Sequence, residues 1–190
     1  MPAHPHPGFG KADILGYSLG GGVALQTVIR HPEAVRKLVI VSTACNLGGW
    51  YPEVQAGFGG MNAAATRAWV GSPMHRAYAS VATKPEDWPV LVDKLGRLLT
   101  QNYDWSEDVA KMKTPTLIAI GDADAIRTAH AVEIFGLLGG GKAEGGWDGS
   151  GMPNSRLAIL PATTHYDILF SPTLASAVNQ FLDVPGAEKK

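Results

Sequence analysis

The chain has 190 residues, of which 45% are hydrophobic and 17% charged, and its net charge is −1. This length and composition predict one domain with a sizeable core and room for an insertion. No basic patch, basic amphipathic segment or long apolar run stands out, so we expect no nucleic-acid partner and no membrane partner. The single cysteine, Cys45, excludes an intrachain disulfide and is compatible with the cytoplasmic location that we expect.

The first predicted strand covers residues 12–17, and a helix is predicted from about residue 19 to residue 30. Between them lies the sequence Gly16-Tyr17-Ser18-Leu19-Gly20, which reads G-x-S-x-G. A serine at the tip of a tight turn between a strand and a helix is typical of a nucleophile elbow. The competing interpretation is a glycine-rich turn that contains an incidental serine.

A turn this tight forces the backbone of Ser18 to a positive φ. We expect Gly16 and Gly20 to be glycines because side chains would collide at these positions. The strain holds the Ser18 hydroxyl out at the end of the strand, beside the start of the helix. There the backbone N–H of Leu19 is the expected donor to a developing oxyanion, aided by the helix dipole.

The remaining elements alternate along the chain, with one interruption. Strands are predicted at residues 37–42, 116–120 and 156–160, and helices at about 129–138 and from Ser171 onward. The alternation predicts an α/β fold with a mainly parallel sheet flanked by helices. Residues 46–113 show helical periodicity without a strand and form a predicted cap or lid, which leaves 1–45 and 114–190 as the core.

Ser18, Asp124 and His165 each fall just after the carboxyl end of a predicted strand. Parallel sheets place their functional sites at this edge. A serine hydroxyl is a weak nucleophile at neutral pH and needs a neighbouring base, usually histidine, which in turn needs a group that fixes its tautomer. The chain order Ser, Asp, His is that of the α/β-hydrolases.

Three motifs carry a more specific resemblance: Gly-Tyr-Ser-Leu-Gly-Gly, then Gly-Asp-Ala-Asp, then Leu-Pro-Ala-Thr-Thr-His. With them the chain resembles the carboxyl-terminal two-thirds of an α/β-hydrolase of the serine esterase type. The resemblance implies that Ser18 is the nucleophile, Asp124 the acid and His165 the general base. It also implies that the helical insertion takes the place of the family's cap, which shapes the substrate pocket.

Other polar residues compete for these roles. Asp122 also follows the third predicted strand and is the alternative to Asp124 as the acid. Asp148 is interpreted as a loop residue and Asp167 as a neighbour of the histidine. His130 is expected to be exposed at a helix start. Ser42 ends the second predicted strand and is a candidate to face the site, although no elbow surrounds it.

The chain departs from the family pattern ahead of its first predicted strand. Family members carry several strands there, and a loop with a His-Gly type motif that supplies a second oxyanion donor. Only about a dozen residues precede that strand in this sequence. The resemblance therefore implies an open strand edge, and open edges invite pairing. We expect a second copy of the chain or an amino-terminal partner to cover it; a truncated or split hydrolase subunit with little activity alone is the remaining alternative.

These residues predict a serine hydrolase, first of all a carboxylesterase that cleaves small or medium-chain esters through an acyl-enzyme. The same triad resembles that of lactonases, C–C bond hydrolases and cofactor-free haloperoxidases, so these activities stay open. A dehalogenase of this family would carry aspartate in place of Ser18. No spacing of Cys and His typical of zinc sites is present, and we expect no metal and no cofactor.

Overall fold

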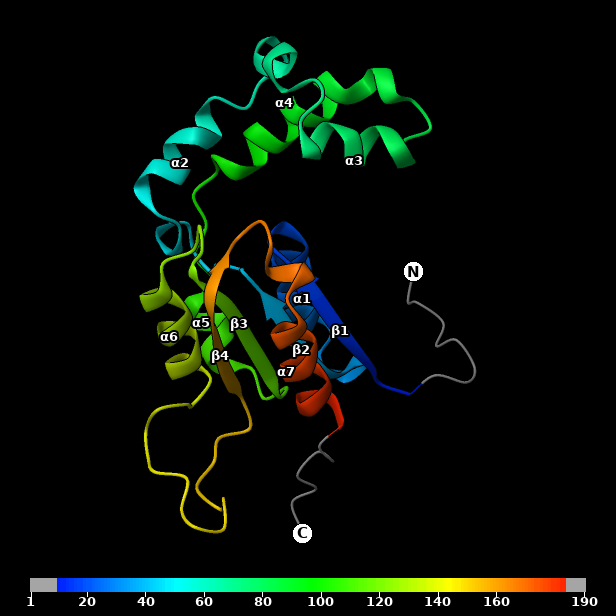
Figure 1. The fold of residues 1–190 in the computed structure, drawn as a ribbon. Helices are drawn as coiled ribbons and strands as arrows, with labels where there is room; N and C mark the ends of the chain where they lie inside the picture. The colour runs from blue at the N-terminus through cyan, green and yellow to red at the C-terminus, as the bar shows by residue number, and fades with distance from the viewer. Residues whose placement is uncertain (1–9, 184–190) are drawn as a thin grey trace. The chain divides into compact units, whose positions relative to one another are not determined.

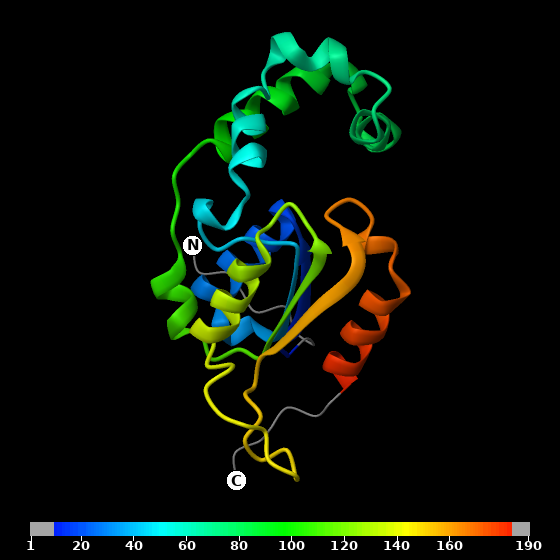
Figure 2. The ribbon, with the colours of Figure 1, turned by 60° about the vertical axis from the view of Figure 1, so that its left-hand side comes forward.

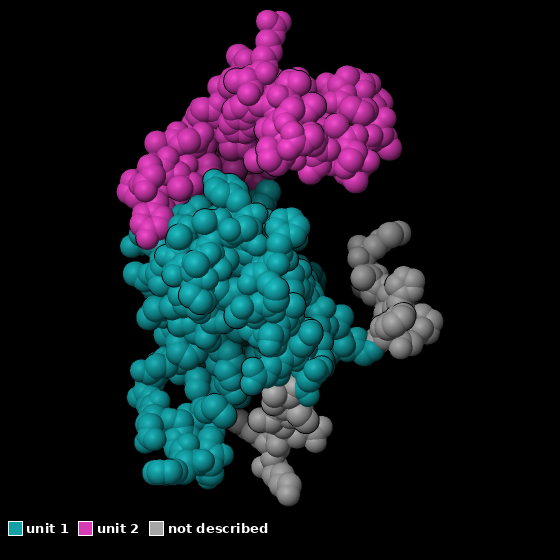
Figure 3. All heavy atoms as spheres, viewed as in Figure 1, with its two compact units in different colours: residues 1–49, 104–190 teal, residues 50–103 magenta. Residues whose placement is uncertain are grey.

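The computed structural model describes residues 10–183. The chain divides into two compact units, one formed by residues 1–49 and 104–190 and the other by residues 50–103 (Figure 3). The second unit lies inside the predicted insertion, and its role as a cap stays a prediction. The outermost parts of the predicted core, 1–9 and 184–190, lie outside the described residues.

The first unit contains a parallel sheet whose strands lie in chain order, β1-β2-β3-β4 (Figure 1). The strands are β1 (Ala12–Tyr17), β2 (Val35–Val41), β3 (Thr116–Ala123) and β4 (Arg156–Thr164). Because every pair is parallel, all four carboxyl ends meet at one edge of the sheet. The predicted α/β fold with a parallel sheet flanked by helices is confirmed.

Helices cover both faces of this sheet, with α7 on one side and α1 and α6 on the other (Figure 2). Their bounds are α1 (Leu19–Arg30), α6 (Thr128–Leu137) and α7 (Pro172–Asp183). Successive side chains of a strand point to opposite faces, so strands covered on both sides read as continuous apolar runs. The α7 side buries alternate residues of β2 and β3 together with Leu174, Val178 and Phe181 of the helix.

Two strands run further than the sequence pattern predicts. β3 continues from residue 120 to Ala123, and β4 continues from residue 160 to Thr164. A bulge shifts their pairing between Gly121 and Ala123, so that Ala123 pairs with Thr164. Proline cannot donate to a strand ladder, but β4 is the edge strand of the described sheet, so it accommodates Pro161 without losing a necessary hydrogen bond.

The second unit is built from helices alone within its described residues. They are α2 (Pro52–Gly59), η3 (Ala63–Trp69), α3 (Pro73–Val81), η4 (Pro85–Asp87) and α4 (Trp88–Leu99). Side chains cap two of them: Asn62 accepts the N–H groups of Ala64 and Ala65, and Ser72 accepts that of His75. Trp88 is buried in this unit, with the ring of His75 edge-on 5.3 Å away.

The chain returns to the first unit at Asp104, and α5 (Ser106–Lys111) follows. Three short 3₁₀ turns complete the unit: η1 (Pro32–Ala34), η2 (Leu47–Gly49) and η5 (Ile168–Phe170). No helix between residues 10 and 183 combines the length and the apolar character that crossing a membrane requires.

The β1 strand has one partner, β2, among the described residues. Leu15, in the middle of β1, is half exposed. That a second copy or an amino-terminal partner covers this edge stays a prediction. The mass of the purified protein in solution tests whether the chain associates with a second copy.

Candidate active site

The elbow has the strained backbone that the sequence predicts. Ser18 follows β1 directly, with φ 51° and ψ −121°, and it precedes the first residue of α1. Its N–H donates to the carbonyl of Val41, which extends the pairing of β1 with β2 into the turn. Leu19 opens α1, so its N–H belongs to the first turn, where intrahelical acceptors are lacking. The turn thus offers a backbone donor beside the serine hydroxyl.

Of the two glycines expected to be required for space, the structure supports one. A Cβ on Gly16 would collide with the carbonyl of Gly20, as the tight turn requires. A Cβ on Gly20 would meet no described atom within 4 Å, so the expectation that this position needs glycine for space is wrong. The necessary second glycine is Gly21, where a Cβ would run into the hydroxyl of Thr43, two residues after β2. Close packing of α1 on the sheet sets this requirement.

Ser18, His165 and Asp124 lie in hydrogen-bond order at the carboxyl ends of β1, β4 and β3. The Ser18 Oγ is 3.0 Å from His165 Nε2, and His165 Nδ1 is 2.8 Å from Asp124 Oδ1. Both His165 and Asp124 are buried. A carboxylate only accepts hydrogen bonds, so Nδ1 carries the proton and Nε2 presents its lone pair to the Ser18 hydroxyl. This is the tautomer that a general base requires.

Groups other than His165 also hold the Asp124 carboxylate. The Ser42 hydroxyl donates to Oδ2 at 2.5 Å, and the N–H groups of Gly121 and Ile126 donate to the carboxylate at 3.3 Å and 3.0 Å. Burial raises the pKa of Asp124, but the hydrogen bonds from His165, Ser42 and Ile126 outweigh it and lower the pKa below its ordinary value. The carboxyl group is therefore ionised at neutral pH and fixed in orientation.

Ser42 is the site residue whose role the sequence left open. It is buried at the end of β2 and has the same φ as Ser18, 51°. The strained backbone aims its hydroxyl at Asp124. The only signal in the sequence is a serine directly after a buried strand, and many serines end strands without such a role.

The other candidate acids bind backbone N–H groups. Asp122 accepts the N–H groups of Ala162 and Thr163, and these bonds lower the pKa of its carboxyl group. Asp167 accepts the N–H and the hydroxyl of Thr164, next to the histidine. Asp148 accepts the N–H of Ser150 in a distant loop. Between Asp122 and Asp124, geometry places Asp124 against the base.

His130 is fully buried, which corrects the expectation that it is exposed. Its Nδ1 lies 2.9 Å from Glu133, and its Nε2 accepts the N–H of Cys45 at 3.2 Å. It ties α6 to the chain that leaves β2. The sequence around it carries no sign of burial, because a loop that arrives from elsewhere in the chain covers it. Burial also raises the pKa of the Cys45 thiol to about 11, so the thiol is unreactive.

We expect His130 to make the fold less stable in mild acid. Burial lowers its pKa below the ordinary value of 6.5, and Arg127 lowers it further, whereas Glu133 and Asp104 oppose the shift. The unfolded chain therefore binds a proton more readily than the folded chain, and the free energy of unfolding falls as pH drops below about 6.5. Urea titrations between pH 8 and pH 5 should show this fall in the wild type and a smaller one in His130→Gln.

His31→Gln is the matched control, since His31 is an exposed histidine of the same unit. The carboxyl groups with lowered pKa values titrate in all three proteins, so their contribution cancels in the comparison. If the free energy of unfolding falls equally between pH 8 and pH 5 in the wild type and in His130→Gln, the prediction is contradicted.

Residues 10–183 contain no group of three or more His, Cys, Asp or Glu side chains placed to hold a metal ion.

The sequence matches a family model described as "alpha/beta hydrolase fold" over residues 6–69. Among curated proteins, the 2-hydroxymuconate semialdehyde hydrolase of Pseudomonas sp. (strain CF600) is 56% identical over 34 residues. That stretch is 18% of this chain and 12% of the relative, so the likeness is local.

Solved structures match over nearly the whole chain. An α/β-hydrolase enzyme from a Medee basin deep-sea metagenome library has a TM-score of 0.62 at 19% identity, over 96% of this chain and 69% of its own. The meta-cleavage product hydrolase of Pseudomonas fluorescens IP01 has a TM-score of 0.62 at 17% identity, over 91% of this chain and 65% of its own. The chain thus spans about two thirds of the length of these proteins, and the likeness is one of fold.

Proposed function

The chain belongs to the α/β-hydrolase superfamily, and from this premise we propose that it is a serine hydrolase that cleaves carboxylic esters through an acyl-enzyme. The observation that carries the proposal is the unbroken hydrogen-bond order from Ser18 through His165 to Asp124. Separate strand ends bring these three side chains together, and the tautomer that Asp124 imposes on His165 is the one that accepts the serine proton.

In the first half of the reaction, Ser18 Oγ attacks the ester carbonyl carbon while its proton passes to His165 Nε2. Asp124 stabilises the imidazolium that forms. The carbonyl oxygen gains the negative charge, and the Leu19 N–H donates to it. Collapse of the tetrahedral intermediate breaks the bond to the alcohol oxygen, which takes the proton from His165. The alcohol leaves, and the acyl group stays on Ser18.

In the second half, a water molecule attacks the acyl carbon and gives its proton to His165 Nε2. The second tetrahedral intermediate collapses, the proton returns to Ser18 Oγ, and the carboxylic acid leaves. An ester is the substrate class that demands least from the site, because its leaving oxygen needs only the one proton that His165 holds. Small or medium-chain esters are therefore the first substrates to examine.

Hydrolysis of a C–C bond is the second candidate. It is supported by the local likeness to 2-hydroxymuconate semialdehyde hydrolase and by the fold shared with a meta-cleavage product hydrolase. The two reactions use the same nucleophile and base and differ in the leaving group, which is carbon in one and oxygen in the other. The carbon leaving group needs a substrate that can take up the bonding electrons, so the substrate distinguishes the two activities.

The test compares two substrates and one covalent probe on the purified chain. We expect a higher kcat/KM for p-nitrophenyl acetate than for 2-hydroxymuconate semialdehyde. A fluorophosphonate should attach once, with loss of fluoride, and peptide mass spectrometry should place it on Ser18. A higher kcat/KM for 2-hydroxymuconate semialdehyde would favour C–C bond hydrolysis over ester hydrolysis. Absence of both turnover and labelling from folded protein would contradict the proposal as a whole.

Labelling of Ser18 without turnover of either substrate would favour the split-hydrolase alternative. Light scattering on the same sample gives the mass, so activity can be assigned to a monomer or to an assembly. A dimer with Ser18-dependent turnover would support self-association at the β1 edge.

A further inference from the structure

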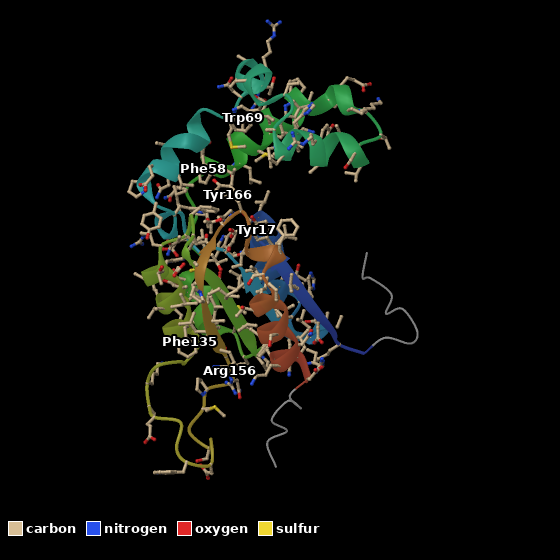
Figure 4. All side chains as sticks on the ribbon, in the orientation of Figure 1. Tyr17, Phe58, Trp69, Phe135, Arg156 and Tyr166 are labelled. Atoms are coloured by element: carbon tan, nitrogen blue, oxygen red, sulfur yellow. The ribbon has the colours of Figure 1, made fainter. Side chains whose placement is uncertain are left out.

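Tyr17 occupies the position directly before the elbow serine, at the end of β1. Its ring is half-buried against the apolar cluster between the sheet and α7, which includes Ile168 and Val178. Its hydroxyl donates to the backbone carbonyl of His165 at 2.6 Å. Figure 4 labels Tyr17 at the end of β1 and Tyr166 in the loop that follows β4. One side chain of the elbow thus contacts the loop that carries the base.

Both the hydroxyl and the ring of Tyr17 contact His165. The Tyr17 and His165 ring centroids are 5.2 Å apart, with the ring planes at 39°. Burial raises the pKa of the Tyr17 hydroxyl, and the Asp124 carboxylate and Tyr166 raise it further, so the hydroxyl stays a donor across neutral and alkaline pH. The His165 carbonyl therefore keeps its hydrogen-bond donor at neutral pH.

The loop that carries His165 is held by side chains at other points as well. Asp122 holds the backbone at Ala162 and Thr163, and Asp167 holds it at Thr164. Tyr17 differs from these in holding His165 itself, and it does so from the residue adjacent to Ser18. Any shift of the elbow is thereby passed to the histidine, which favours a constant distance between Ser18 Oγ and His165 Nε2.

We propose that Tyr17 is a positioning residue that couples the nucleophile elbow to His165, so that the imidazole stays aligned between Asp124 and Ser18. The inference rests on the proposed function, in which His165 is the general base. Small displacements of a base cost rate steeply, because proton transfer and attack must be aligned in the same step. The hydroxyl of Tyr17 is expected to act on kcat and to leave substrate binding unchanged.

Tyr17→Phe removes the hydroxyl and keeps the ring in the apolar cluster. We expect kcat for p-nitrophenyl acetate to fall about tenfold with KM within about twofold of the wild type. Thr116→Val is the matched control, because the buried Thr116 hydroxyl likewise donates to a backbone carbonyl, that of Thr114, at 2.9 Å, at the end of β3 away from the site. It should change neither constant. Urea unfolding of both variants reports the loss of stability that a lost hydrogen bond brings by itself.

A second readout does not depend on turnover. The proton on His165 Nδ1, bound to Asp124, should give a low-field proton NMR signal that His165→Gln removes. We expect this signal to shift or broaden in Tyr17→Phe and to persist unchanged in Thr116→Val. If Tyr17→Phe keeps the kcat, the KM and the NMR signal of the wild type, the inference is overturned and Tyr17 has only a structural role, whether or not the variant is less stable. If the wild type shows no Ser18-dependent turnover, the proposed function fails, and the NMR signal still decides the role of Tyr17.

Discussion

Ser18→Ala should lower kcat for ester hydrolysis by about 10⁶-fold, the loss that removal of a triad nucleophile brings. Without Oγ no acyl-enzyme forms, and His165 and the Leu19 N–H are left to promote only a slow direct attack by water. The fluorophosphonate should no longer attach. Steady-state assays at saturating ester concentration measure the fall in kcat. Intact-protein mass spectrometry shows whether the fluorophosphonate has attached.

Ser176→Ala is the matched control for this substitution, because Ser176 is an exposed serine in α7 of the same unit. It should keep wild-type kcat. Ser18 sits at positive φ, so the variant's urea midpoint must be measured beside its activity. A folded Ser18→Ala protein that keeps more than about a hundredth of wild-type kcat would contradict the nucleophile assignment, since loss of a triad nucleophile normally leaves far less.

Asp124→Ala should lower kcat by about 10⁴-fold, less than loss of the nucleophile because Ser18 and His165 remain. The substitution removes the acceptor of His165 Nδ1–H, so the imidazole loses its fixed tautomer and the charge that balances its protonated form. The Ser42 hydroxyl and the Ile126 N–H lose their acceptor as well. We therefore expect the urea midpoint to fall along with kcat, and circular dichroism to show that the fold persists.

Asp122→Ala provides the comparison that separates the two candidate acids. Asp122 binds the backbone at Ala162 and Thr163, whereas Asp124 is the carboxylate that lies 2.8 Å from His165 Nδ1. Its loss should loosen the loop and reduce kcat by no more than about a hundredfold, the cost of a misplaced group. An effect of Asp122→Ala equal to or larger than that of Asp124→Ala would show that the acid has been assigned to the wrong carboxylate.

The fold was largely predictable because its strands are buried on both faces. Such strands read as apolar runs, and β1 and α1 were predicted with the bounds that the structure shows. The ends of β3 and β4 were not, since Gly121, Asp122 and Pro161 are residue types that rarely occur inside strands. Pairing across the bulge extends both strands, and that pairing joins segments some forty residues apart.

The candidate site was likewise predictable from the sequence only in part. The G-x-S-x-G turn and the positions after strands predicted that Ser18, His165 and an aspartate after β3 would meet, because parallel strands bring their carboxyl ends to one edge. They left Asp122 and Asp124 as alternatives. Ser42 and Tyr17 were not predictable, since neither residue belongs to a motif whose chemistry requires it. Their roles depend on which side chain meets which partner across the sheet, and that is a property of register and packing.

The sequence by itself determined the parallel sheet, the elbow and the order of the three candidate catalytic residues, because periodicity and local turn chemistry act over a few neighbouring residues. Only the tertiary structure brought Asp124 to the His165 imidazole, buried His130, and made Gly21 rather than Gly20 the glycine that close packing requires. Each of these outcomes is a contact between segments far apart in the chain. Local sequence does not encode such contacts, and the packing of helices on both faces of the sheet creates them.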